Sequence, residues 1–129
     1  AAVPFVDALT TILDPELPLS AMEWEEWGNP IEDPEVYAYM KSYTPYENIR
    51  PVRYPAIAAV TSLHDTRVLY VEPAKWIAAL REQIDPSSPV PLLKIDMSGG
   101  HGGGSGTYTR WREIAWDYAF LLSNLGVTE

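Results

Sequence analysis

Pro55-Ala56-Ile57-Ala58-Ala59-Val60-Thr61-Ser62-Leu63 is a continuous run without the polar and apolar alternation of a half-exposed strand. Such a run is typical of a strand that is covered on both faces in a parallel sheet. A helix is predicted from about Pro73 to the break at Asp85 to Pro89, and Val90 to Met97 predicts the next strand. The predicted helix carries apolar residues on one face, namely Trp76, Ile77, Leu80 and Ile84. A strand, a helix and a strand within about forty residues form a crossover unit with parallel strands, so the fold class is α/β.

The segments outside this unit carry shorter patterns. Ala1 to Phe5 is apolar and is expected to be the end of a buried strand that begins upstream of the given sequence. Asp7 to Leu13 predicts a helical turn, and the following loop contains prolines at positions 15, 18 and 30. Asp33-Pro34-Glu35 predicts a helix start, with Asp33 as the N-cap, and this helix is expected to extend to about Ser42. A last helix is expected from about Thr109 to Leu125.

The composition describes a globular protein of one domain. The chain has 129 residues, of which 47% are hydrophobic and 21% charged, and this length is sufficient to bury a core. No apolar run approaches the roughly 18 residues of a membrane span, so we expect no membrane partner. The absence of cysteine excludes disulfides and thiolate zinc sites and favours a reducing compartment such as the cytoplasm.

The charge is strongly negative and unevenly distributed. Asp and Glu number 18 against 9 Lys and Arg, which gives a formal net charge of -9. This balance argues against nucleic-acid binding, because phosphate contacts need clustered cations. Residues 1–40 contain nine acidic residues and no Lys or Arg. A field of this sign attracts cations, although a solvated acidic surface explains the same pattern.

Polar side chains follow both predicted strands. Asp65 lies in Leu63-His64-Asp65-Thr66-Arg67, and His101 lies in the glycine-rich stretch Ser98-Gly99-Gly100-His101-Gly102-Gly103-Gly104. Parallel strands end at one edge of the sheet, and this edge carries the site in open α/β sheets, so we expect Asp65 and His101 to face the same crevice. An acid followed by a histidine is the order that α/β hydrolases use after their nucleophilic serine. The residues alone leave an alternative open, in which Asp65 is a structural aspartate in a turn and His101 is a histidine in a flexible loop, and neither is catalytic.

The nucleophile of such a triad is not found in the sequence. No Gly-x-Ser-x-Gly elbow occurs, and Ser105 is a poor substitute because it follows the histidine and no strand leads into it. A triad serine is therefore expected before Ala1. His64 is assigned no catalysis, since consecutive residues in an extended turn point apart. The histidines are far apart in sequence, which argues against a metal site, and the glycine run lacks the ending of a phosphate loop.

Six further blocks of sequence carry a resemblance to a known family. They are Val3-Pro4-Phe5-Val6-Asp7, Glu23-Trp24-Glu25-Glu26-Trp27-Gly28-Asn29-Pro30, Tyr39-Met40-Lys41-Ser42-Tyr43, Leu63-His64-Asp65-Thr66-Arg67-Val68, Glu72-Pro73-Ala74-Lys75-Trp76 and Gly99-Gly100-His101-Gly102-Gly103. In this order, and over essentially the whole chain, they resemble the C-terminal part of the catalytic domain in the oligopeptidase B branch of the prolyl oligopeptidase family of serine peptidases. The resemblance implies an α/β-hydrolase domain, capped in the full protein by a β-propeller, that cleaves short peptides after Arg or Lys. It implies no cofactor.

The resemblance also gives each candidate residue a role. Asp65 resembles the triad acid and His101 resembles the triad base. Glu23 and Glu25 resemble the carboxylates that bind the basic side chain of the substrate, a role that suits them because a guanidinium forms bidentate, charge-assisted bonds with carboxylates. Arg67 resembles the arginine that holds a backbone carbonyl of the bound peptide. Without the resemblance, Glu23 and Glu25 are surface acids and Arg67 is a partner for nearby acids.

The chain departs from the family pattern in what it lacks. It carries neither the serine, nor the upstream part of the oxyanion hole, nor the propeller, so residues 1–129 alone are expected to be inactive and to need the N-terminal part of the same protein. Gly104 also stands where close relatives often have Lys. Two other functions remain open: a non-enzymatic acidic domain that binds basic peptides or a partner subunit, and an esterase, which gives no reason for carboxylates at Glu23 and Glu25.

Overall fold

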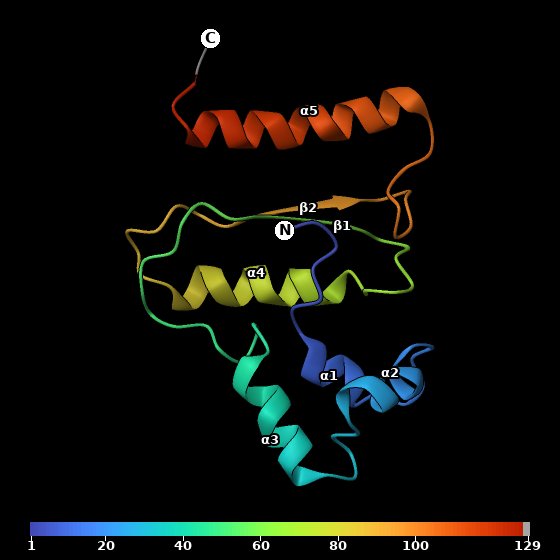
Figure 1. The fold of residues 1–129 in the computed structure, drawn as a ribbon. Coiled ribbons are helices and arrows are strands. Elements are labelled where there is room, and N and C mark those ends of the chain that lie inside the picture. Colours follow the sequence, from blue (N-terminus) through green and yellow to red (C-terminus); the bar gives the residue numbers. More distant parts are fainter. Residues whose placement is uncertain (128–129) are drawn as a thin grey trace.

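Two parallel strands and the helix between them form the centre of the molecule. The computed structural model describes residues 1–127, and its strands are β1 (Ala58–Ser62) and β2 (Leu92–Asp96). Their register pairs Ala58 with Leu92 and Ser62 with Asp96. Helix α4 (Val71–Gln83) connects them, lying against one face of the strands while α5 (Thr107–Asn124) runs along the other (Figure 1). The predicted crossover unit and the α/β class are confirmed.

The first residues of the chain add a parallel segment to the other edge of β1. Ala2 pairs with Val60, the Val3 N–H donates to the Val60 carbonyl at 2.8 Å, and the Val60 N–H donates to the Ala1 carbonyl at 2.9 Å. The expected strand end is therefore present. The expectation that it is buried is wrong for Ala1 and Ala2, which are exposed at this edge.

Helix α4 packs tightly on β1 because the strand presents small side chains. Ala59 is fully buried and packs against Ile77 and Leu80 of the helix, and Ile84 completes this core. The helix begins two residues before the predicted start, so Pro73 lies in its first turn. A proline is tolerated there, since the N–H groups of the first turn have no partner within the helix.

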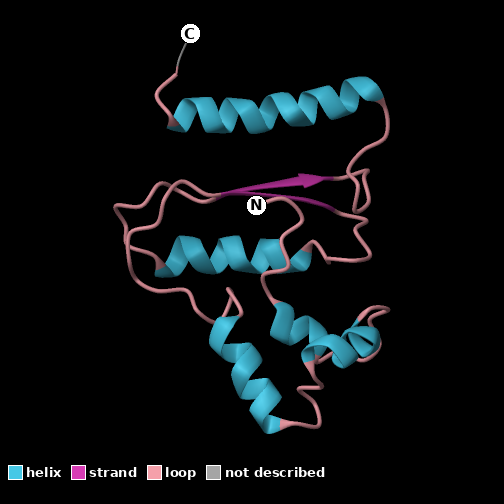
Figure 2. Ribbon diagram, viewed as in Figure 1, coloured by secondary structure: helices cyan, strands magenta, loops and turns pink. Residues whose placement is uncertain are grey.

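A second core lies among the helices of the N-terminal third, α1 (Ala8–Ile12), α2 (Ser20–Trp27) and α3 (Pro34–Tyr43) (Figure 2). Its buried residues are Leu9, Ile12 and Met40, with Phe5, Leu13, Trp24, Trp27 and Val36 packed around them. The predicted N-cap of α3 is confirmed, because Asp33 Oδ1 accepts the N–H groups of Glu35 at 2.8 Å and Val36 at 3.4 Å.

Helix α2 was expected to be part of a loop, and this expectation is wrong. The prolines at positions 18 and 30 flank the helix instead of interrupting it. The indole of Trp24 donates to the Ile12 carbonyl at 3.0 Å, which ties the helix to the second core. This tertiary contact, rather than a strong local pattern, holds the segment in helical form.

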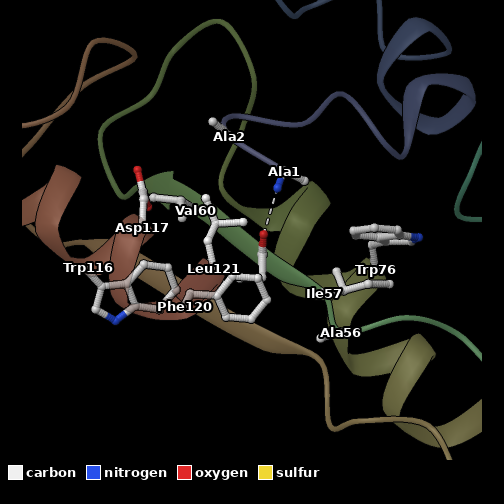
Figure 3. A pocket seen from close by; sticks show the side chains of 11 residues that line it. Ala1, Ala2, Ala56, Ile57, Val60, Trp76, Trp116, Asp117, Phe120 and Leu121 are labelled. Carbon is white, nitrogen blue, oxygen red and sulfur yellow. Dashed lines mark hydrogen bonds between the residues drawn. The ribbon is translucent and has the colours of Figure 1, made fainter. Parts of the chain in front are cut away.

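Helix α5 has its predicted place but buries none of its side chains within residues 1–127. Several of its large apolar residues are exposed, including Trp111, Tyr118 and Leu121, and so is Leu125 directly after it. A mainly apolar cavity of about 420 Å³ lies between this helix, β1 and the first residues of the chain. In Figure 3, Trp116, Phe120 and Leu121 face Val60 and Ile57 across it. We call the surface formed by Trp111, Tyr118 and Leu121, together with this cavity, the open face.

In the described part of the chain, no helix is both long and apolar enough to cross a membrane.

Candidate active site

The loops that follow β1 and β2 are hydrogen-bonded to each other. The Leu63 N–H donates to the Asp96 carbonyl at 2.8 Å, and the His64 N–H donates to the Gly99 carbonyl at 3.2 Å. These bonds extend the parallel pairing of the strands past their ends, as expected for strands that finish at one edge. The turn with Asp65 and the loop with His101 therefore lie together.

Asp65 and His101 are in direct contact. Nδ1 of His101 lies 2.9 Å from Oδ2 and 3.1 Å from Oδ1 of Asp65. The Asp65 side chain is fully buried, whereas 36% of the His101 side chain is exposed. The predicted meeting of the two loops is confirmed, with the imidazole between a buried carboxylate and solvent.

The surroundings of Asp65 favour its ionised form. Its Oδ1 accepts the backbone N–H groups of Arg67 at 2.9 Å and Val68 at 3.0 Å. Burial, the largest single influence, raises the pKa of this carboxyl, but the two N–H bonds and the contact with His101 outweigh it and hold the pKa below its usual value.

The state of Asp65 fixes the state of the imidazole. An ionised carboxylate only accepts hydrogen bonds, so Nδ1 of His101 must carry a proton. In the neutral ring, Nε2 then has a free lone pair, and within residues 1–127 only Nδ1 of this ring bonds to protein. The pair can therefore take a proton at Nε2 from a group that approaches from solvent.

Glycines give the His101 loop its close packing. Asp96, the last residue of β2, accepts the Ser98 N–H at 2.8 Å and the Gly99 N–H at 3.1 Å through Oδ1. A Cβ atom at Gly99 would lie 2.6 Å from Asp96 Oδ2 and 2.7 Å from the Gly103 carbonyl carbon. Gly103 itself has a φ of 79°, a conformation that favours glycine. The loop is thus closely packed at Gly99 and Gly103.

The two candidate substrate carboxylates differ in their surroundings. Glu23 is half-buried on α2 and lines a small cavity together with Thr66 and Arg67. Glu25 is exposed and lies outside this cavity, because residues two apart on a helix face different sides. Burial raises the pKa of Glu23, and the charge of Glu26 adds to this shift. The structure brings Glu23, but not Glu25, to the Asp65 turn.

Arg67 lies between the Asp65 turn and the cavity at Glu23. Its backbone N–H binds Asp65, its side chain is exposed, and the residue lines the same small cavity as Glu23. Among the described residues it forms no salt bridge; the pairs are Lys75 with Asp7 and His101 with Asp65. The guanidinium is thus open to a ligand from outside the chain.

In residues 1–127 neither a candidate metal centre nor a Gly-x-Ser-x-Gly elbow accompanies the pair. Residues 1–127 contain no group of three or more His, Cys, Asp or Glu side chains that could hold a metal ion. Ser105 is exposed in a bend before α5.

Comparison with known proteins assigns this chain to a family. The model of the prolyl oligopeptidase family matches residues 1–128. The chain belongs to the prolyl oligopeptidase family. Its homologues are serine peptidases with an α/β-hydrolase catalytic domain.

Similar family members are known from bacteria and from trypanosomatids. The chain is 47% identical to Protease 2 of Moraxella lacunata over 126 residues, covering 98% of this chain and 18% of that protein. It is 46% identical to dipeptidyl aminopeptidase BI of Pseudoxanthomonas mexicana, covering 97% of this chain and 17% of that protein. The structure of oligopeptidase B from Leishmania major superimposes with a TM-score of 0.93 at 46% identity over 100% of this chain and 18% of that one. The chain thus spans less than a fifth of the length of these relatives.

One part of the site was missed at the level of secondary structure. The helix that carries Glu23 was read as loop, although Ser20-Ala21-Met22-Glu23 has the Ser-x-x-Glu spacing of a helix N-terminus. In the structure, Ser20 is the first residue of α2, and its hydroxyl donates to the Thr11 carbonyl at 2.8 Å. The Ser20 side chain caps no N–H group of α2, so the spacing is only a weak local signal and the tertiary bonds hold the helix.

Proposed function

We propose that this chain is the C-terminal part of the catalytic domain of a serine oligopeptidase that cleaves short peptides after Arg or Lys. The observation that carries the proposal is the 2.9 Å contact of His101 Nδ1 with the buried carboxylate of Asp65, in a chain of a serine peptidase family. The nucleophile segment and the β-propeller belong, in this proposal, to the N-terminal part of the same protein.

In the proposed reaction, His101 is the base and Asp65 orients it. The serine hydroxyl attacks the carbonyl carbon of the peptide while its proton passes to Nε2 of His101. Asp65 keeps the proton on Nδ1 and stabilises the imidazolium that forms. His101 then gives the proton from Nε2 to the departing amine nitrogen, and water hydrolyses the acyl-enzyme by the same route. The buried side chain of Asp65 and the half-exposed ring of His101 suit these two roles.

Glu23, Glu25 and Arg67 select and hold the substrate in this proposal. A carboxylate at Glu23 pairs with the guanidinium or ammonium of the substrate, and Arg67 donates to a backbone carbonyl of the peptide. Because Glu23 lies beside Arg67 and Glu25 is exposed away from it, we expect Glu23→Gln to raise KM for arginyl substrates more than Glu25→Gln does. Glu32→Gln, at an exposed position, is the matched control.

The deciding experiment uses the full-length protein with arginyl, lysyl and neutral peptide substrates, together with a simple acyl ester. We expect turnover of the basic peptides, weak turnover of neutral peptides, and covalent labelling by a serine-directed fluorophosphonate. Labelling with equal turnover of neutral peptides contradicts the basic specificity, and a preference for the simple ester indicates an esterase. Binding of basic peptides without labelling or turnover indicates a non-enzymatic domain.

A blocked substrate distinguishes two modes of cleavage within the family. One relative is named a dipeptidyl aminopeptidase and another a protease. We propose endopeptidase action, so an arginyl peptide with an acetylated N-terminus should be cleaved. Loss of all turnover on acetylation contradicts this.

The missing part of the protein is proposed to pack on the open face. The face is apolar and contains the cavity of about 420 Å³ (Figure 3), and relatives are more than five times longer than the matched segment. Burial of this surface by upstream polypeptide removes apolar groups from water and brings the serine to His101.

A further inference from the structure

A buried carboxylate that the proposed mechanism does not use lies in the first turn of α4. Glu72 is 1% exposed. Its Oε1 accepts the Thr11 hydroxyl at 2.6 Å, and its Oε2 accepts the Asp7 N–H at 3.0 Å. Both donors come from the N-terminal segment, more than sixty positions away along the chain.

On one side, Glu72 is connected to the helix that carries Glu23. Thr11 donates its hydroxyl to Glu72 and accepts the Ser20 hydroxyl with its own carbonyl at 2.8 Å. Ser20 is 1% exposed and is the first residue of α2, and Glu23 lies one turn later on the same helix. The start of α2 is therefore fixed to Glu72 through one residue.

On the other side, Glu72 is connected to the turn that carries Asp65 and Arg67. Its backbone N–H donates to the Leu69 carbonyl at 3.0 Å, which ties the end of this turn to the start of α4. Residues of both sides line the small cavity at Glu23, namely Thr11, Ser20, Thr66, Arg67 and Leu69. Glu72 thus lies behind the point where the two halves of the site meet.

The surroundings of Glu72 are unusually polar for a core position. Asp7 is 2% exposed and forms a salt bridge with Lys75, whose ammonium lies 4.5 Å from the centre of the Tyr46 ring. Packing alone does not require this arrangement, because well-packed apolar residues of similar volume are often at least as stabilising as a buried ionic group. A carboxylate differs from an apolar side chain in one respect: its directional bonds fix the distance between the segments that donate to it.

We infer that Glu72 is a positioning residue for substrate recognition, which sets the distance between Glu23 on α2 and the Asp65–Arg67 turn. The inference rests on the proposed function, in which Glu23 and Arg67 bind one substrate. Glu72 itself touches neither the substrate nor the reacting atoms. Loss of its bonds lets α2 shift relative to the turn, which weakens binding of a basic side chain more than it affects the chemical step at His101.

The test measures kcat and KM of the full-length protein with paired arginyl and neutral peptides. Glu72→Ala and Thr11→Val each remove one partner of the hydrogen bond between the Thr11 hydroxyl and the Glu72 carboxylate. Thr11→Val does so with little change in side-chain volume. We expect each to raise KM for the arginyl peptide by about tenfold, which corresponds to a loss of about 1.4 kcal/mol of binding free energy. The KM for the neutral peptide and both kcat values should stay close to those of the parent.

Conservative variants should restore recognition. In Glu72→Gln the amide oxygen can accept the Asp7 N–H, while the amide N–H can donate to Thr11 Oγ1. Thr11→Ser keeps the hydroxyl. Both should retain the parental KM. Thr44→Val is the control for loss of a buried hydroxyl, since Thr44 is fully buried, directly follows α3, and donates its hydroxyl to the Met40 carbonyl in the last turn of that helix at 2.7 Å.

The outcomes separate this inference from the proposed function. A parent enzyme without preference for basic residues contradicts the proposed function and this inference together. If the parent enzyme prefers basic residues, the proposed function stands. If Thr11→Val and Thr11→Ser then have the same ratio of KM for the arginyl peptide to KM for the neutral peptide, only the inference about Glu72 is overturned. Equal losses on both peptides, or the same change in Thr44→Val, likewise overturn it. Because Thr11→Val is nearly isosteric, the Thr11 pair decides the question even where Glu72→Ala does not fold.

Discussion

The carboxylate of Asp65 receives hydrogen bonds from three groups, the N–H groups of Arg67 and Val68 and the imidazole of His101. Two of these donors belong to its own turn, so the carboxylate is oriented before any substrate binds. The same turn carries the side chain that is proposed to hold the peptide. In the proposed function, orientation of the base and recognition of the substrate therefore depend on one short segment, residues 65–68.

Asp65→Asn tests the orienting role of the carboxylate. An amide N–H group facing His101 favours the tautomer with the proton on Nε2, which cannot act as a base. We expect kcat of the full-length protein to fall by about 10⁴, the size of effect seen in another serine peptidase triad. Asp85→Asn is the control, because Asp85 also accepts a turn N–H, that of Ser87 at 2.8 Å, but is not part of the site. Parental turnover in Asp65→Asn removes this carboxylate from the mechanism.

Glu72 predicts a pH dependence of stability. Burial, the largest influence, raises the pKa of its carboxyl above the usual value, and the charge of Asp7 acts in the same direction. The folded state therefore binds the proton more tightly than the unfolded state, whose pKa is about 4.3. The contribution of this group to stability is greatest below that pH, falls as the pH rises towards the folded-state pKa, and is constant above it.

Glu72→Gln should remove this dependence. We expect the thermal midpoint of the variant, relative to the parent, to increase between about pH 4.3 and the folded-state pKa of Glu72 and then to level off. The measurement is thermal unfolding of the full-length protein across this range of pH. Glu82→Gln, at an exposed position of α4, is the matched control. Parallel curves for parent and Glu72→Gln contradict the raised pKa.

Among the elements, the loop between β2 and α5 is closely packed at one glycine. Gly99 lies against Asp96 and the backbone of Gly103, so Gly99→Ala forces the loop to move. Overpacking of this kind costs about 1–3 kcal/mol, and we expect kcat/KM to fall because His101 moves with the loop. Gly102→Ala meets no atom within 4 Å and should lose much less activity. Equal losses in the two variants would mean that crowding at Gly99 is not what fixes the loop.

The sequence was most informative where one element carries its own signal. The runs at Pro55–Leu63 and Val90–Met97 predicted both strands and their parallel order, and therefore the meeting of Asp65 with His101. Asp33 and Pro34 predicted the start of α3 for a local reason, the capping of exposed N–H groups.

Features that depend on distant contacts could not be predicted in this way. Helix α2 is held by the bond of Trp24 to Ile12 and of Ser20 to Thr11, and no local pattern encodes such partners. The burial of Glu72 depends on residues more than sixty positions away. The different surroundings of Glu23 and Glu25 follow from the helix that was missed.

At the scale of the whole molecule, the open face is an exposed apolar surface. Large apolar side chains of α5 are exposed over its length, for example Trp111 at 59% and Tyr118 at 61%. An apolar surface of this kind is a site of association, and the edge of the sheet at Ala1 and Ala2 is exposed as well.

Residues 1–129 expressed alone should therefore self-associate or require the N-terminal part of the protein for folding. Light scattering after size-exclusion chromatography measures the association, and denaturant unfolding measures the cooperativity. Replacement by Gln of Leu121 in α5 and of Leu125 directly after it, both exposed, should reduce the association. A monomeric parent chain that unfolds cooperatively contradicts the prediction.

The open face also suggests a use for the protein in two pieces. If the upstream part is produced separately, the proposed serine resides on one polypeptide and the Asp65–His101 pair on the other. Turnover then requires docking at α5, so the rate of a chromogenic reaction reports the concentration of the reassembled enzyme. In such a complementation assay, the rate of colour formation would rank single replacements along α5 by how much each weakens the docking of the two pieces.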